Sequence, residues 1–116
     1  MRRWGRPWHG SGVFALTRLR VPSSAATELD PLVAALLATL AARPGFLGGE
    51  VGRAADDPEL WALLTRWDGV GSYRRALSAA EVKIAGAPVW VHAVDEPGVY
   101  VDGADGSGAA APEAAR

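Results

Sequence analysis

The residues of this chain that could do chemistry are few. There is no cysteine, which excludes disulfides, thiolate metal sites and cysteine nucleophiles. His92 is expected in a core strand, where it is the one group that titrates near neutral pH and therefore the obvious base. Trp67 and Tyr73, six residues apart, close the stretch from Arg43 to Tyr73, which is the part of the chain specific enough to suggest a function.

The composition is that of an ordinary soluble protein with a single domain. The chain has 116 residues, of which 49% are hydrophobic and 22% charged, and its net charge of −1 argues against binding to phosphate-rich surfaces. The longest apolar helix expected, Leu32 to Ala42, is too short to cross a bilayer. The first three residues begin like a signal peptide, but Trp4 to Pro7 follow where its apolar core should be. We expect a cytoplasmic protein without a membrane partner.

The two ends of the chain are expected to lie outside the folded domain, which should span residues 13–102. Residues 1–12 combine three arginines with two tryptophans, a pattern that could stack on single-stranded nucleic acid. Three arginines in a chain of net charge −1 favour instead an extended arm that docks on the domain or on a partner subunit. Nucleic acid is therefore not a predicted partner. Residues 103–116 are small and acidic and are predicted to be disordered.

The first half of the domain predicts a strand, a helix and a second strand. Val13 to Val21 is rich in β-formers and precedes a proline. Leucines and a valine then recur with helical spacing from residue 29 to residue 40. Asp30-Pro31 predicts the start of this helix, with an earlier start near Ser24 left open, and Pro44-Gly45 predicts its end. Phe46 to Ala54 is the second strand, and its glycines predict a bulge or a close approach by a neighbour.

The second half is less clear. Glu59 to Asp68 fits a helix or a strand equally well by periodicity, and the local signals favour a helix slightly. A helix follows from Asp68-Gly69, and a capping box at Ser78–Glu81 predicts a further short helical turn that ends at Gly86. Val89 to Val94 predicts the next strand, and a turn leads from it to residues 99–101.

This order of elements resembles the antibiotic-biosynthesis monooxygenase family over residues 13 to about 95. The matching residues are Arg43-Pro44-Gly45-Phe46-Leu47-Gly48, the strand end Leu63-Leu64-Thr65-Arg66-Trp67, and the following helix with Tyr73 and its break at Ser78. The resemblance implies an α+β, ferredoxin-like domain: a four-stranded antiparallel sheet with two main helices on one face, which dimerises into an α+β barrel. The resemblance also favours the interpretation of Glu59 to Trp67 as a strand rather than a helix.

A homodimer is expected from the residues as well. The first strand and the Val89–Val94 strand are apolar on both faces, whereas two short helices can cover only one face of the sheet. A second copy of the chain is the simplest cover for the other face.

The resemblance also implies a function. Oxygenases of this family use no flavin, haem or metal, because the anion of a phenolic or quinol substrate reacts directly with dioxygen. We therefore predict a cofactor-independent monooxygenase that acts on an aromatic, quinol- or anthrone-like small molecule. By resemblance Trp67 would supply a flat wall and Tyr73 a hydroxyl, while Arg74 or Arg66 would supply a fixed cation. The predicted catalytic residues are Trp67, Tyr73 and His92. The predicted substrate-binding residues are Thr17, Leu63, Thr65, Arg74 and Leu77.

A non-catalytic alternative stays open. Trp67 and Tyr73 can be explained as core residues, and His92 as a structural one. Leu63 stands where quinol-oxidising relatives carry an asparagine, and residues 70–85 lack the histidine that haem-degrading relatives need. The alternative is a dimeric barrel that binds a small apolar ligand or serves only for assembly.

Overall fold

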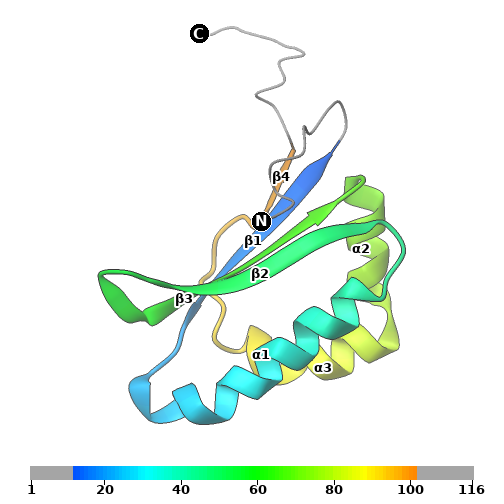
Figure 1. Cartoon of the computed structure of the whole chain (residues 1–116). Coiled ribbons are helices and arrows are strands. Elements are labelled where there is room, and N and C mark those ends of the chain that lie inside the picture. The colour runs from blue at the N-terminus through cyan, green and yellow to red at the C-terminus, as the bar shows by residue number, and fades with distance from the viewer. Residues whose placement is uncertain (1–11, 102–116) are drawn as a thin grey trace, which may run out of the picture.

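The computed structural model describes residues 12–101. The predicted N-terminal arm, apart from Gly12, and the predicted disordered tail lie outside these residues. The described part forms one antiparallel sheet in the order β2-β3-β1-β4, with the helices on one face (Figure 1). The elements are β1 (Val13–Arg20), the 3₁₀ turn η2 (Ser23–Ala25), α1 (Ala26–Ala41), β2 (Phe46–Ala54), β3 (Asp57–Trp67), α2 (Val70–Ser78), α3 (Ala80–Trp90) and β4 (Val99–Val101). The predicted α+β, ferredoxin-like sheet is confirmed.

The core lies between the sheet and the helices. Alternate side chains of β3 point into it, and this alternation is the strand pattern that the resemblance favoured over a helix. β3 begins two residues earlier than expected, at Asp57. The largest fully buried side chains are Trp61, Trp67, Leu19, Leu36 and Leu40.

α1 starts earlier than Asp30-Pro31 predicted. The helix begins at Ala26 after η2, so the start near Ser24 that the sequence left open is the better description, and Pro31 lies inside the helix. The whole stretch Ser23–Ala41 is 19 residues long, and by length and composition alone it could cross a membrane. Its leucine and valine stripe is instead buried in the core, and α1 packs on α3 and β2. A core helix of a soluble domain has this arrangement.

The glycines at the junction of α1 and β2 serve close packing. Gly45 has a φ of 91°, and a Cβ there would lie 2.7 Å from the Oδ1 atom of Asp68. At Gly49 a Cβ would lie 2.8 Å from a methyl group of Leu37 on α1. The β2–β3 pairing also shifts register between Phe46 and Gly48. The bulge and the close approach that the sequence predicted are both present.

The prediction of a strand at Val89–Val94 is wrong. α3 includes the first two residues of this run and ends at Trp90, because Val82, Gly86 and Val89 share one helical face, which is buried. Beyond the helix, Ala93 forms only an isolated bridge with Leu19. The expected helix end at Gly86 is therefore also wrong. The fourth strand of the sheet is β4, so the two-sided apolar character of Val89–Val94 no longer supports a dimer.

The break between α2 and α3 is confirmed, but its capping box is not formed. Ala79 has extended backbone angles and separates the two helices. The Ser78 hydroxyl donates a hydrogen bond back to the carbonyl of Arg74 (3.1 Å), and no side chain caps the start of α3.

Candidate functional site

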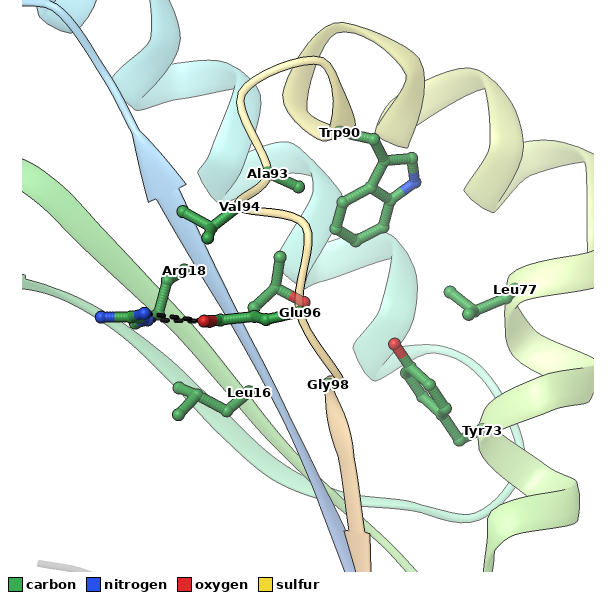
Figure 2. Close-up of a pocket in the computed structure, with 10 residues that line it drawn as sticks. Leu16, Arg18, Tyr73, Leu77, Trp90, Ala93, Val94, Glu96 and Gly98 are labelled. Atoms are coloured by element: carbon green, nitrogen blue, oxygen red, sulfur yellow. Dashed lines mark hydrogen bonds and ion pairs between the residues drawn. The ribbon is translucent and has the colours of Figure 1, made fainter.

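A cavity of about 370 Å³ lies between β1, α2, the end of α3 and the segment 93–98 (Figure 2). Its volume is within the range of small-molecule sites, near the lower end. Most of the groups on its wall are apolar, including Leu77 and Val94. A second hollow, of about 510 Å³, lies beside α1 and contains none of the predicted site residues.

The cavity lies beside an irregularity in the pairing of two neighbouring segments. Ala15 pairs with Val99 in β4, and Leu19 pairs with Ala93 in an isolated bridge. Four residue steps separate Ala15 from Leu19, whereas six separate Ala93 from Val99, so the second segment carries two extra residues. These residues form a bulge along the edge of β1, which we call the 94–98 bulge. Backbone hydrogen bonds hold both of its ends: Val94 N–H to Arg18 C=O (2.9 Å), and Leu16 N–H to Gly98 C=O (2.7 Å).

An ion pair ties the 94–98 bulge to β1. Arg18 donates two hydrogen bonds to the Glu96 carboxylate, from Nε (2.8 Å) and from Nη2 (2.7 Å) (Figure 2). Two parallel bonds of this kind fix the relative orientation of both groups. These hydrogen bonds hold the pKa of the Glu96 carboxyl below its ordinary value. The cavity wall therefore contains one cation and one anion, which neutralise each other.

Tyr73 supplies a hydroxyl to the cavity. The residue is on α2, is only 8% exposed, and directs its hydroxyl toward the enclosed space (Figure 2). Burial raises the pKa of this hydroxyl. It is therefore a neutral hydrogen-bond donor at physiological pH.

Trp67 is sealed behind Tyr73 and does not line the cavity. It is fully buried, and its ring packs edge-on against Phe46 (5.3 Å between centroids) and tilted against Tyr73 (5.7 Å). Its indole N–H donates to the Thr65 hydroxyl (2.8 Å), which satisfies both groups in the core. In this position Trp67 supports the ring of Tyr73 from behind.

The structure brings together only some of the predicted site residues. Three of them line the cavity: Thr17 from β1, and Tyr73 and Leu77 from α2. Leu63 and Thr65 are buried with Trp67 on the inner face of β3 and are not part of the cavity lining.

The predicted charged groups lie elsewhere. The side chain of Arg74 is exposed to solvent, and Arg66 lies over the ring of Phe14, on the face of β1 and β3 that alternates with the buried one. His92 is not in a core strand but in the turn after α3, where its N–H bonds to the carbonyl of Val89 (3.0 Å). Its side chain does not line the cavity.

Sequence reasoning missed Trp90, Arg18 and Glu96, all of which line the cavity. Trp90 was expected in a strand, so its helical neighbour Gly86 carried no signal. Arg18 and Glu96 are 78 positions apart, and no spacing rule links them. Within residues 12–101, no group of three or more His, Asp or Glu side chains is placed to hold a metal ion.

Solved structures with this fold come from several organisms. SnoaB, a cofactor-independent oxygenase from Streptomyces nogalater, superposes with a TM-score of 0.70 at 22% identity, covering 78% of this chain and 92% of its own. Rv0793 from Mycobacterium tuberculosis gives a TM-score of 0.65 at 19% identity, with coverages of 78% and 92%. A conserved protein from Methanosarcina mazei Go1 gives 0.66 at 16% identity, with coverages of 78% and 90%. At these identities the likeness shows the fold.

The sequence itself shows the family. No curated protein matches it. The model of the family described as antibiotic biosynthesis monooxygenase matches residues 12–86, more than half of the chain. This match begins just before β1, includes both tyrosine and tryptophan of the 67–73 pair, and ends inside α3. The chain belongs to the antibiotic biosynthesis monooxygenase family.

Proposed function

We propose that the chain is a cofactor-independent monooxygenase that oxidises an aromatic, quinol- or anthrone-like molecule with dioxygen in the cavity beside Tyr73. The observation that carries the proposal is a protonated, buried hydroxyl directed into a mostly apolar cavity, in a member of this family. SnoaB, which has the same fold, is itself described as a cofactor-independent oxygenase.

The reaction requires few groups from the protein. An anthrone that loses a proton from its central methylene becomes an electron-rich anion, whose charge lies largely on the carbonyl oxygen. The anion gives electrons to dioxygen, the ring carbon gains one oxygen atom as a new carbonyl, and the other oxygen atom leaves as water with the two methylene hydrogens. The Tyr73 hydroxyl would donate a hydrogen bond to the oxyanion, and a buried donor of this kind stabilises developing charge without reorganisation.

Oxygen uptake with an anthrone or a 1,4-naphthoquinol tests the proposal. We expect uptake by the wild-type protein and a decrease of about 100- to 1,000-fold in kcat for Tyr73→Phe, the order expected for losing one hydrogen bond to developing charge. His92→Gln tests the predicted base, which stays a prediction. Ile84→Ala is the control, because Ile84 is 77% exposed and lies outside the cavity lining. Equal rates for Tyr73→Phe and the control would refute the role of Tyr73.

The second candidate is a non-catalytic barrel that binds a small apolar ligand. The observation that favours it is Leu63, which occupies the position of the expected asparagine and is 3% exposed, so no amide group reaches the cavity from there. This alternative predicts that anthrone quenches tryptophan fluorescence at the same concentrations at which no oxygen is consumed.

We also propose that the protein is a homodimer, joined through the sheet face that the described helices leave uncovered (Figure 1). The side chains that alternate with the buried ones on β1 and β3 are mostly apolar on that face: Phe14, Leu16, Leu60, Ala62 and Leu64. An apolar face of a sheet needs a cover, and a second copy supplies an identical one. Light scattering should give the mass of two chains for wild type and for Ile84→Glu, and of one chain for Leu64→Glu. A monomeric wild type would refute the assembly.

A further inference from the structure

The last residue of α3, Trp90, has a packing environment that the family resemblance did not indicate. Trp90 is partly buried, packs on the core, and contributes its indole to the cavity wall. Figure 2 shows the ring projecting from the end of α3 into the space between the 94–98 bulge and the α2 side chains of Tyr73 and Leu77. Among the aromatic residues that the structure describes, Trp90 and Tyr73 line this cavity.

Gly86 determines where that indole can lie. It is four residues before Trp90, one helical turn back on the same face, and it is buried. A Cβ built on Gly86 would lie 2.8 Å from Cε2 and 3.0 Å from Cδ1 of the indole, closer than van der Waals contact allows. The pyrrole edge of the ring thus rests directly on the backbone of α3. Any larger residue at position 86 would push the ring away from the helix.

A glycine in a helix interior weakens the helix, so this one needs a compensating role. Its backbone does not require glycine, because the positive φ among the described glycines belongs to Gly45. An alanine at position 86 would place its Cβ where the indole of Trp90 lies, so glycine is needed there for packing.

The charged residues of the cavity lining indicate what the cavity can bind. Arg18 and Glu96 are the charged residues of the cavity lining, and they are engaged with each other. Apart from the indole N–H of Trp90 itself, the remaining polar side-chain groups of the lining are the hydroxyls of Thr17 and Tyr73. Because the cation of the lining is already paired with Glu96, the lining favours an uncharged planar ligand over an anionic one.

We propose that Trp90 is the surface on which an uncharged, planar ring system stacks in this cavity, and that Gly86 is the residue that positions Trp90 for it. Trp67, the flat wall expected from the sequence, is fully buried and cannot serve in this way. The inference rests on the proposed function only for the choice of ligand class. It names Trp90 as a specificity-determining residue and Gly86 as a positioning residue.

Binding measured without oxygen separates this inference from the catalytic proposal. Equilibrium dialysis of anthrone under anaerobic conditions should show about 5- to 10-fold weaker binding for Trp90→Leu, the order expected for the loss of one ring pair. Trp90→Phe, which keeps a ring, should stay within about 3-fold of wild type. Val91→Ala, an exposed neighbour, is the control and should bind as wild type does.

A double-mutant cycle tests the role of Gly86. Gly86→Ala should weaken binding by a similar factor, and Gly86→Ala/Trp90→Leu should be no weaker than Trp90→Leu alone, because Gly86 acts through the ring. Circular dichroism of each variant checks that it is folded. Wild-type affinity in Trp90→Leu, fully additive losses in the double variant, or no anthrone binding by wild type would each overturn the inference. Trp90-dependent binding without any oxygen uptake would sustain it and would refute the oxygenase.

Discussion

Replacement of Gly45 by alanine should be among the most destabilising single changes in this domain. The residue has a φ of 91°, a left-handed conformation that costs an ordinary residue about 1–2 kcal/mol. The new Cβ would also lie 2.5 Å from the Cβ of Ser72 and 2.7 Å from the Oδ1 atom of Asp68. Both contacts are shorter than real Cβ contacts, and forcing extra atoms into a packed site costs about 1–3 kcal/mol. The sum is a loss of about 2–5 kcal/mol.

The loss should spread to the cavity, because Gly45 supports the start of α2. Its carbonyl accepts a hydrogen bond from the Asp68 N–H (2.9 Å), and Ser72 donates its hydroxyl to the Asp68 carboxylate. Tyr73 is the next residue along α2. A displaced first turn of α2 would move the hydroxyl that the cavity depends on.

The assay is unfolding in urea at 25 °C, followed by circular dichroism, with a thermal scan in parallel. For a domain of this size a loss of 2 kcal/mol lowers Tm by about 8–16 °C. Gly52→Ala is the matched control, because a Cβ at Gly52 meets no atom within 4 Å. We expect it to change stability by less than about 0.5 kcal/mol. If Gly45→Ala were as stable as Gly52→Ala, the packing account of the junction would be wrong.

Three further predictions concern the cavity wall. Arg18 lowers the pKa of Glu96 in the folded protein, so their pair contributes stability above the unfolded carboxyl pKa of about 4.3 and loses it as the pH falls through the lower folded value. The difference in unfolding midpoint between wild type and Glu96→Gln should therefore shrink between pH 6 and pH 3. A constant difference would contradict the pairing. Glu96→Gln should also raise the affinity for anthracene-9-carboxylate relative to anthrone, measured by dialysis, because Arg18 loses its carboxylate partner. Trp67→Phe should cost about 1–3 kcal/mol in urea unfolding, since it removes buried volume and the bond to Thr65, while the affinity for anthrone should change less than it does in Trp90→Leu.

Much of the fold could be predicted from local patterns. The bounds of β2 are those that the sequence predicted, because Pro44-Gly45 and the turn before Asp57 limit it on both sides. β3 needed the family resemblance, since its short run of apolar residues fits either period. The prediction failed at Val89–Val94 because Val89 belongs to a helix face that is completed by Val82 and Gly86, while Val91 is exposed in the turn after α3.

The site was predictable only where it lies on correctly predicted elements. Thr17, Tyr73 and Leu77 were found because β1 and α2 were placed correctly. Trp67 was expected in the cleft, but a tryptophan in the middle of a core cannot be told from one at its edge by sequence. Arg18 and Glu96 meet only because of the 94–98 bulge, and a register shift between distant segments leaves no trace in composition or spacing.

The 94–98 bulge makes the size of the cavity mouth a matter of chain length. Its two extra residues are bracketed by hydrogen bonds that hold Leu16 and Arg18 in place on either side. A shorter 94–98 segment would allow continuous pairing along β1 and narrow the entrance of the cavity. A longer segment would widen the entrance, and neither change would alter the core. Insertions and deletions, rather than substitutions, are then the changes through which relatives of this domain could exchange small ligands for large ones while keeping the same core.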